Sequence, residues 1–462
     1  MIVYFVNREH ELETLGSLLS RGKPALVLLY GRRRVGKTRL IQEFLKDKKG
    51  MYFYVPNAEA KTILDEFSRT VEGEFFKGFR FADYDSFLDY VAKKSEQNVI
   101  VAIDEFQRLA NRNGAISLLQ KYWDQRMSKT KSFIILSGST IGAIRKVALR
   151  GDAPLYGRRT ATLKVEPLKF LDLPKWFRKY GMADLVKVYA SFGGTPAYLE
   201  QVDEKNTVED NILSKILNKH SPLYGEPEML LMEEIRAPHR YMDILAAIAQ
   251  GKNKISEIAD ATGLARENTT TYLKTLETLD LIERMTSVTE PQAKKGMYKI
   301  KDPFFTFWFR FVKPNRRQLE LELEHNLWSS IQEEFNTYLG RAFEDVCLQI
   351  LAQMAKRRLL PIQPDRIGKW WWMDAEIDIL AIETKQRRTL AIETKWTELN
   401  YSETKSLLGQ LNAKTAQIPN TRETCVGVIA KKIANKERLR SQGFTVLDLQ
   451  DIENLAKTQT GT

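Results

Sequence analysis

Short apolar runs alternate with amphipathic segments through the first third of the chain. Apolar runs of this length, separated by helical patterns, predict strands that alternate with helices. Parallel strands need crossover connections, so this order predicts a parallel sheet with helices packed on its faces. The predicted strands are Ala25–Tyr30, Met51–Val55, Val99–Ile103, Phe133–Leu136 and Thr160–Val165. We therefore predict an α/β domain over residues 1–166.

The pattern then changes three times. Residues 167–238 are helical throughout, apart from an interruption at Phe192–Pro196. Residues 239–314 contain three short helices followed by a hairpin-like stretch, and residues 315–462 begin with long helices before turning to strands at 376–384 and 389–395. The chain is too long for one ordinary core, and four domains with these boundaries are predicted.

The residues after the first strand form a phosphate-binding motif. Gly31–Thr38 reads GRRRVGKT, which matches G-x-x-x-x-G-K-[ST], and an amphipathic helix, Arg39–Phe44, follows. Such a loop points backbone N–H groups at phosphates, with the positive end of a helix behind them. Lys37 would reach the β- and γ-phosphates, and the Thr38 hydroxyl would bind magnesium. The predicted cofactors are ATP and Mg²⁺, and the predicted contacts are Gly31, Val35, Gly36, Lys37, Thr38 and Arg39.

Two later strands end in polar residues that suit phosphoryl transfer. The strand Val99–Ile103 is followed by Asp104 and Glu105, and Phe133–Leu136 is followed by Ser137, Gly138 and Ser139. Asp104 is placed to hold the magnesium shell, and Glu105 to polarise the attacking water. Ser139 would touch the γ-phosphate or the water. A helix cap at Asp104 and a plain turn at Ser139 are the structural alternatives.

Several segments together resemble one family. The N-terminal Phe5–Glu9, the Asp104-Glu105 strand, Ser137–Ser139, Leu155–Thr160 and Gly193–Leu199 look like the marks of the archaeal ATPase family, a group of AAA-like, STAND-related P-loop proteins. The resemblance covers roughly the first half of the chain. It implies that Asn7 and Arg8 lie near the adenine, that Pro196 closes over the nucleotide from a helical lid, and that Arg158 senses the γ-phosphate. Arg159 could replace Arg158, and Arg32, Arg33 and Arg34 could face a partner.

Composition narrows the setting and the partner. The net charge is +12 and the pI is near 9.3, which favours a polyanionic partner such as DNA. No apolar run is long enough for a membrane span, so no membrane partner is expected. With two distant cysteines, four histidines and no recognisable leader, we expect a cytoplasmic protein without a zinc site. A homo-oligomer and a protein partner remain open.

Residues 254–300 predict a winged helix-turn-helix. Lys254–Leu264 is a helix that ends in a glycine-containing turn, and Glu267–Leu279 is a second helix with an apolar face. Two short strands around a basic loop follow, as in a wing. Contacts to the major groove are predicted for Arg266, Asn268, Thr269, Thr271 and Lys274, and wing contacts to phosphate for Lys294 and Lys295. A module that serves only as a lid or interaction surface is the alternative.

The last domain carries a pattern of acidic residues. A helix contains Glu344, one strand contains Asp378, and the next contains Glu393 and Lys395. Alternation on a strand places Glu393 and Lys395 on one face, where carboxylates can bind metal and the lysine can act on water. This looks like a PD-(D/E)xK nuclease site, with Asp378 and Glu393 as metal ligands. Glu383-Thr384-Lys385 is an alternative Glu-x-Lys, but it lies at a turn too close to Asp378.

The predicted fold class is thus multidomain α/β: a P-loop parallel-sheet ATPase core, a helical lid, a winged helix-turn-helix and a C-terminal α/β restriction-endonuclease-like domain. We expect an ATPase whose nucleotide state controls DNA binding and, through the last domain, metal-dependent DNA cleavage. One rival is a regulatory or signalling switch of the STAND type that cuts no DNA. The other is a ring-forming DNA motor. Whether Arg158 would act within its own subunit or on a neighbour stays open.

Overall fold

The computed structural model describes residues 5–110, 114–293 and 296–458. The chain divides into two compact units, Met1–Pro167 with Thr278–Asp280, and Leu168–Glu277 with Leu281–Thr462. The predicted lid, winged helix and C-terminal domain therefore share one unit, apart from Thr278–Asp280, and the boundaries among them stay a prediction. Within the described residues, no helix combines the length and apolar character needed to cross a bilayer.

The first unit is built on a five-stranded sheet in the order β2-β3-β4-β1-β5, with every pairing parallel. The predicted strands are confirmed to within two residues at either end. The strands are β1 Ala25–Tyr30, β2 Gly50–Tyr54, β3 Ile100–Asp104, β4 Phe133–Gly138 and β5 Ala161–Lys164. Strands β1, β3 and β4 are almost entirely buried, which explains their unbroken apolar sequence.

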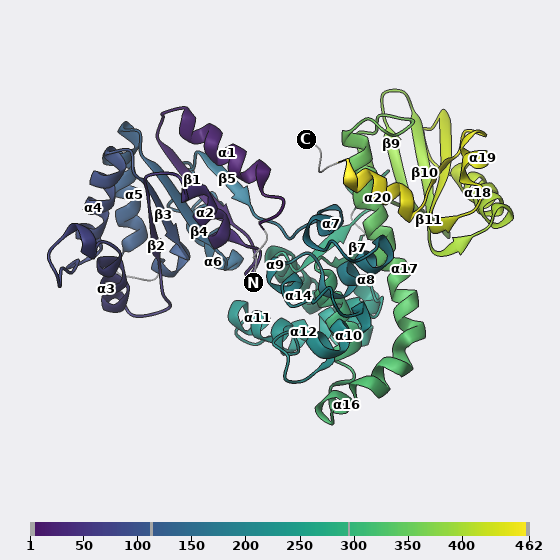
Figure 1. The fold of residues 1–462 in the computed structure, drawn as a ribbon, viewed down its shortest axis with the longest axis horizontal. Helices are drawn as coiled ribbons and strands as arrows, with labels where there is room; N and C mark the ends of the chain where they lie inside the picture. The colour runs from purple at the N-terminus through teal and green to yellow at the C-terminus, as the bar shows by residue number, and fades with distance from the viewer. Residues whose placement is uncertain (1–4, 111–113, 294–295, 459–462) are drawn as a thin grey trace. The chain divides into compact units, whose positions relative to one another are not determined.

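Helices cover both faces of this sheet (Figure 1). One hydrophobic cluster joins the sheet to α3, α4 and α5, and the other joins it to α1 and α2. The apolar residues of each helix recur at helical spacing and form these two cores. The helices are α1 Glu9–Ser20, α2 Lys37–Leu45, α3 Ala60–Thr70, α4 Tyr84–Glu96, α5 Ala115–Gln125 and the short α6 Ile141–Ile144.

The second unit begins with short helices, as the sequence predicts for residues 167–238. They are α7 Leu173–Trp176, α8 Met182–Phe192, α9 Pro196–Leu199, α10 Val208–Ile212 and α11 Glu226–Glu234. The Gly193-Gly194 pair has a packing role here. Gly193 has φ +69°, and a Cβ on Gly194 would overlap the carbonyl oxygen of Leu168. Pro196 occupies the first turn of α9, where its missing N–H costs no hydrogen bond.

The predicted winged helix is present in the same unit. Helix α13 ends at Gly263, whose φ of +64° makes the left-handed turn into α14, and β6 and β7 pair antiparallel behind it. Leu273 and Leu276 of α14 are fully buried in its core. The elements are α12 His239–Ala249, α13 Ile255–Thr262, α14 Arg266–Thr278, β6 Ile282–Met285, β7 Met297–Ile300, α15 Pro303–Phe307 and α16 Arg316–Glu320.

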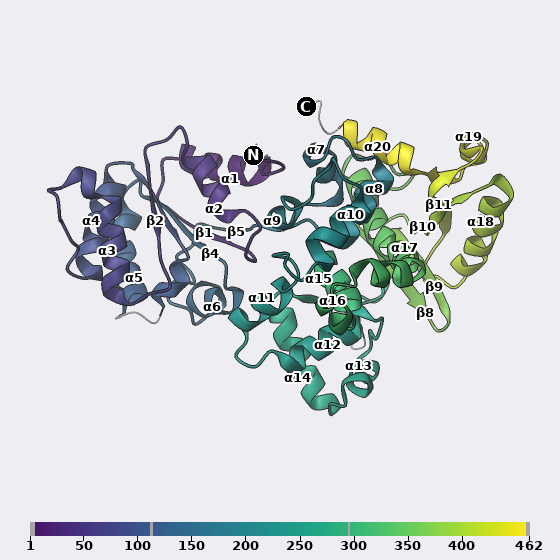
Figure 2. The same cartoon turned by 60° about the horizontal axis from the view of Figure 1, so that its bottom comes forward.

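The chain ends in a second five-stranded sheet, in the order β12-β11-β10-β9-β8. Strands β8, β9 and β10 form an antiparallel meander, whereas β11 is parallel to β10. The long helix α17 packs on this sheet, and α18 packs on β10 and β11 (Figure 2). The elements are α17 Glu324–Lys356, β8 Arg366–Trp372, β9 Ala375–Glu383, β10 Arg388–Leu399, α18 Tyr401–Thr415, β11 Glu423–Ile433, α19 Lys436–Arg440, β12 Thr445–Leu447 and α20 Leu449–Lys457.

Candidate functional site

The strand order brings three predicted motifs to one edge of the first sheet. Strand β4 lies between β1, which leads into the P-loop, and β3, which ends at Asp104. All three strands are parallel, so their carboxyl ends meet at the same edge. Ser139, after β4, therefore lies between the phosphate loop and the acidic pair.

The P-loop has the backbone that its sequence demands. Gly36 has φ +93°, a left-handed conformation that costs glycine little, and helix α2 begins at the next residue. A Cβ on Gly31 would overlap the carbonyl oxygen of Val165, so the loop can pack against the end of β5 only with glycine there. The ammonium of Lys37 donates to the carbonyls of Gly31 (2.9 Å) and Arg32 (2.8 Å). Val35 is buried and Arg39 is exposed.

Thr38 and Asp104, the two predicted magnesium ligands, are in contact. The Thr38 hydroxyl donates to Asp104 Oδ2 at 2.7 Å, and the Tyr52 hydroxyl donates to the same oxygen at 2.8 Å. The Glu105 backbone N–H donates to Asp104 Oδ1 at 3.0 Å. Asp104 is only 1% exposed, so these donors hold a buried carboxylate. Burial, and then the Asp104 charge, raise the pKa of Tyr52, so its hydroxyl stays protonated as a donor.

These residues fit a magnesium ion of the kind that nucleotides bring. A hydroxyl and a carboxylate are the hard oxygen ligands that Mg²⁺ prefers, and it usually takes only one or two from the protein beside phosphates and water. The described residues contain no group of three or more His, Cys, Asp or Glu side chains that could cage a metal. The carboxyl-terminal edge of the first sheet, beside the P-loop, is called the P-loop edge below. It suits a magnesium ion that binds together with a phosphate ligand.

Glu105 stands next to this pair in a constrained conformation. Its φ is +56°, which is unusual for a residue with a side chain. Its Oε2 accepts from the Ser139 hydroxyl at 2.8 Å and from Gln107 Nε2 at 2.7 Å, and lies 3.7 Å from an Arg108 nitrogen. Ser139 is thus in contact with Glu105, and the strained backbone at Glu105 is typical of functional sites.

Arg8, in the N-terminal segment Phe5–Glu9, contacts the backbone of the P-loop. Arg8 is 7% exposed and donates to the carbonyls of Val35 (2.9 Å) and Glu166 (2.8 Å). Asn7, just before it, has φ +51°. The Arg8 side chain therefore stabilises the P-loop by binding a backbone carbonyl of the loop. Contact of Asn7 or Arg8 with adenine stays a prediction, as does closure by Pro196, which belongs to the second unit.

Arg158 does not lie near the P-loop of its own chain. It precedes β5, whose first paired residue, Ala161, is level with Val27 near the start of β1, and its guanidinium binds both carboxylate oxygens of Asp124 at 2.8 Å. The P-loop follows the other end of β1, and a strand of six residues spans about 20 Å. The structure therefore does not bring Arg158 to the phosphate site of its own chain, and a role at the γ-phosphate of a neighbouring subunit stays a prediction. Arg159 is also before β5 and donates to Thr162.

The acidic residues of the C-terminal domain converge. Ile379 and Ile392 form the last pair in the β9–β10 ladder, and Asp378 and Glu393 come directly beyond it. Asp378 accepts from the Thr394 N–H (2.8 Å) and hydroxyl (3.0 Å). Lysines bind the other two carboxylates: Lys395 and Lys414 lie 2.8 and 3.6 Å from Glu393, and Lys369 lies 2.9 Å from Glu344 and 2.8 Å from Glu376.

Burial and neighbouring charges shift the pKa values of Asp378, Glu344 and Lys395. Burial, and next the Glu393 carboxylate, raise the pKa of Asp378. Burial is also the largest cause that raises the pKa of Glu344, with Lys369 opposing it and Asp378 adding to it. The ion pair with Glu393 raises the pKa of Lys395 against the effect of burial. A bound cation would relieve the repulsion between these carboxylates, but no three acidic, histidine or cysteine side chains of the described residues form a group that could cage a metal here.

Most of the predicted DNA-contacting residues on α14 are exposed. These are Arg266, Asn268, Thr271 and Lys274. Thr269 is fully buried, and its hydroxyl donates to the Ala265 carbonyl at 3.0 Å, so the prediction that it faces a groove is wrong. It lies four residues before Leu273 and shares the core-facing side of the helix. Lys294 and Lys295 lie outside the described residues.

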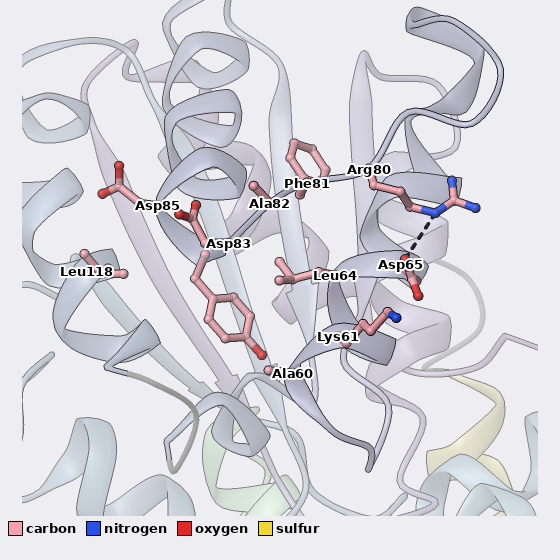
Figure 3. A pocket seen from close by; sticks show the side chains of 11 residues that line it. Ala60, Lys61, Leu64, Asp65, Arg80, Phe81, Ala82, Asp83, Asp85 and Leu118 are labelled. Carbon is pink, nitrogen blue, oxygen red and sulfur yellow. Dashed lines mark ion pairs between the residues drawn. The ribbon is translucent and has the colours of Figure 1, made fainter.

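A cavity of about 530 Å³ in the first unit lies away from all of these positions. Its wall is formed by α3, α4, the loop between them and Leu118 of α5, with an ion pair of 3.1 Å between Arg80 and Asp65 (Figure 3). None of the predicted site residues lines it.

Several residues that the sequence pattern does not single out contact the predicted groups, among them Tyr52, Lys369 and Gln107. Tyr52 reaches Asp104 from the neighbouring strand β2, Lys369 reaches Glu344 of helix α17 from β8, and no local signal marks either of them. Gln107 contacts Glu105. It stands two residues after Glu105, and this proximity to a candidate base is a signal that could have found it.

Three family models match the chain, and they follow one another in the same order as the predicted ATPase, helix-turn-helix and C-terminal domains. A model described as an ATPase domain predominantly from Archaea matches residues 5–202, and one of IclR helix-turn-helix domains matches residues 237–285. A model of archaeal and bacterial proteins of unknown function matches residues 308–407.

Similar proteins extend this finding over nearly the whole chain. The uncharacterized protein MJECL04 of Methanocaldococcus jannaschii is 33% identical over 455 residues, which cover 97% of this chain and 99% of that protein. The uncharacterized ATP-binding protein MJ0423 of the same organism is 58% identical over 48 residues, 10% of this chain and 81% of that one. A solved Walker-type ATPase of Pyrococcus abyssi, 23% identical, covers 66% of this chain and 96% of its own with a TM-score of 0.50, and supports the fold. The chain is an ATPase and belongs to the same family as MJECL04, and in this chain an archaeal ATPase domain is followed by a helix-turn-helix domain and a C-terminal region of unknown function.

Proposed function

We propose that the protein binds ATP with Mg²⁺ at the P-loop edge, hydrolyses it with Glu105 as general base, and uses its nucleotide state to control DNA binding by the winged helix. One observation carries the first part. Thr38, Asp104, Glu105 and Ser139 come from three separate segments and are joined by hydrogen bonds of 2.7 and 2.8 Å. A carboxylate that can activate water, next to a loop that binds phosphates, is what phosphoryl transfer requires.

Each residue then has a distinct task. The P-loop N–H groups and Lys37 would bind the phosphates, for which Lys37 must leave the carbonyls that it now contacts. Thr38 and Asp104 would hold the magnesium ion, which neutralises phosphate charge when bound. Glu105 would accept a proton from the attacking water, and Ser139 would hold its carboxylate in place. Arg158, at the far edge of the sheet, could reach only the nucleotide of a neighbouring subunit.

The DNA-binding part rests on exposed cations and polar groups along α14, on a domain matched by a helix-turn-helix model. Arg266 and Lys274 are the charged members of this set. Each cation that neutralises a phosphate contributes about one to the slope of log affinity against log salt. A protein that uses both would therefore lose affinity steeply as salt rises.

The test measures binding to duplex DNA at several salt concentrations, with and without ATP and Mg²⁺. Arg266→Ala and Lys274→Ala should each weaken binding and flatten the salt slope by about one. Lys23→Ala, an exposed cation before β1, is the matched control and should change neither. DNA affinity that is the same in every nucleotide state, or unaffected by either α14 variant, would overturn this part of the proposal.

We also propose metal-dependent phosphodiester cleavage by the C-terminal cluster. The convergence of Glu344, Asp378 and Glu393, with Lys395 bonded to Glu393, favours it. Asp378 and Glu393 would hold the metal, which would supply a nucleophile at neutral pH, and Lys395 would orient that water or the phosphate. The helix, meander, helix and parallel strand from α17 to β11 would form the nuclease-like fold that the sequence predicts.

Incubation of several DNA forms with Mg²⁺ or Mn²⁺ tests this activity directly. Asp378→Ala and Glu393→Ala should abolish cutting and leave ATP hydrolysis intact, whereas Glu398→Ala, an exposed carboxylate farther along β10, should alter neither. If the wild type nicks no substrate, the cluster is a binding module and the protein a non-cleaving regulatory switch. ATP turnover that DNA stimulates, in particles of ring size, would instead favour the motor.

A further inference from the structure

Gln107 lies in the short helical turn Phe106–Leu109 that follows Glu105. It is 5% exposed, although an amide side chain loses its hydrogen bonds to water when it is buried. Its position results from the left-handed backbone of Glu105, which turns the chain sharply at the end of β3. A buried amide beside a candidate base needs an explanation.

The hydrogen bonds at Glu105 all converge on one oxygen. Oε2 accepts from Gln107 Nε2 and from the Ser139 hydroxyl, and the Arg108 guanidinium lies near the same atom. Within the part of the chain that the structure describes, no side chain or backbone group donates to Oε1. A carboxylate gripped at one oxygen by donors from two directions has a fixed plane, and its second oxygen is available to accept a proton.

The position that lets Gln107 Nε2 bind Glu105 leaves the amide oxygen of Gln107 unpaired among the described residues. Gln107 Oε1 is buried and has no hydrogen-bond partner among the described residues. The same oxygen occupies the space where a Cβ on Gly138 would lie, at the end of β4. A buried side chain chosen only to fill space would be apolar, because an unpaired amide oxygen costs more than a methyl group. The hydrogen bond from the amide to Glu105 must therefore offset the cost of the unpaired amide oxygen.

We infer that Gln107 is the positioning residue of the general base. Its Nε2 fixes the Glu105 carboxylate so that Oε1 is presented to the attacking water, and the missing Cβ at Gly138 leaves room for both the amide and the Ile144 side chain. This inference rests on the proposed role of Glu105. It assigns to Gln107 and Gly138 a part in hydrolysis but none in nucleotide binding.

The test is a comparison of turnover and nucleotide affinity in Gln107→Leu, which keeps the buried volume and removes the donor. The maximal rate of ATP hydrolysis should fall about tenfold or more, while the affinity for ATP with Mg²⁺ stays within twofold of wild type. Gly138→Ala should reproduce this pattern, since its Cβ would displace the amide. Thermal melting of each variant checks that it is folded, and Gln107→Met replaces the leucine variant if that one is not.

A double-mutant cycle separates positioning from a structural effect. In a Glu105→Gln background, Gln107→Leu should cause no further loss of rate, because the base that Gln107 holds is already absent. An equal additional loss in that background, or a fall in nucleotide affinity that matches the fall in rate, would overturn the inference. If Glu105→Gln itself keeps full turnover, the proposed role of Glu105 fails. If Glu105→Gln is inactive and Gln107→Leu is fully active, only the role of Gln107 fails.

Discussion

The two acidic sites of this protein are held in different ways. At the end of β3, neutral hydroxyl and amide groups donate to the carboxylates of Asp104 and Glu105, and a cation, Arg108, lies 3.7 Å from Glu105. In the C-terminal cluster, lysines pair with Glu344 and Glu393, and only Asp378 is held by a neutral residue, Thr394. Both arrangements satisfy the hydrogen bonding of the carboxylates, but lysine pairing in the C-terminal cluster neutralises more of their charge.

This difference determines how readily each site can take a cation. Neutral donors fix the direction of a carboxylate and leave its negative charge in place, so the P-loop edge is prepared for magnesium and its phosphates. A lysine that pairs with a carboxylate competes with an incoming metal for the same charge. We therefore expect the P-loop edge to bind its metal with nucleotide at ordinary concentrations and the C-terminal cluster to bind metal more weakly.

The largest effect is expected at Glu105. Glu105→Gln keeps the size and the hydrogen bonding of the side chain but removes its basicity, so the maximal rate should fall by about 10²- to 10⁴-fold. Steady-state hydrolysis and nucleotide titration on the same preparation measure the two properties. Affinity for ATP should be retained. A variant that hydrolyses ATP at the wild-type rate would break the comparison, because the neutral donors would then be holding a carboxylate without a catalytic task.

A smaller effect, in the opposite direction, is expected at Lys369. Lys369→Met removes the cation that bridges Glu344 and Glu376, and Mn²⁺ should then bind the cluster about fivefold more tightly, the scale of one lost competing charge of ~1 kcal/mol. Calorimetry with Mn²⁺ and without nucleotide measures this change. Lys432→Met, an exposed lysine on β11, serves as the control. Unchanged or weaker binding in Lys369→Met would show that lysine pairing does not limit the site.

Tyr52 sharpens the comparison from the other side. Tyr52→Phe removes one neutral donor to Asp104 and leaves Thr38 in place. The magnesium concentration that gives half-maximal hydrolysis should rise several-fold, since second-shell hydrogen bonds orient metal ligands. The rate at saturating magnesium should change little. A loss of rate that magnesium does not restore would mean that Tyr52 acts on the chemistry itself.

The smallest effect concerns stability. Because burial and then Glu393 raise the pKa of Asp378, the folded protein keeps this proton to a higher pH than the unfolded chain. Stability therefore falls as pH rises from the ordinary carboxyl range through the raised pKa. Asp378→Asn removes that loss, so its melting temperature should exceed the wild type's near pH 7. The two should agree near pH 3, where the aspartate is protonated. A variant less stable than wild type at neutral pH would contradict this account.

The sequence predicts the P-loop edge well because its signals are local. A glycine-rich loop after an apolar strand and a carboxylate after another each depend on a few consecutive residues, and parallel pairing then brings them together. The burial of Thr269 also has a local signal, because its spacing from Leu273 and Leu276 places it on the apolar face of the helix.

Contacts between distant segments could not be predicted in this way. Arg158 binds Asp124 of helix α5, which packs on the same sheet. Lys369 comes from β8, a strand that the sequence pattern does not reveal. Tyr52 occupies an ordinary position on β2 and gains its role only from the register of β2 against β3. Such roles depend on tertiary geometry and leave no trace in spacing or composition.

The most direct test of the account is calorimetric titration of ATP with Mg²⁺ into the folded protein, with Lys37→Ala measured beside it. The account predicts heat for wild type at a stoichiometry of one nucleotide per chain, and none for Lys37→Ala at the same concentrations. Absence of heat in the wild type, or the same heat in both proteins, would contradict the claim that the loop after β1 grips a nucleoside triphosphate.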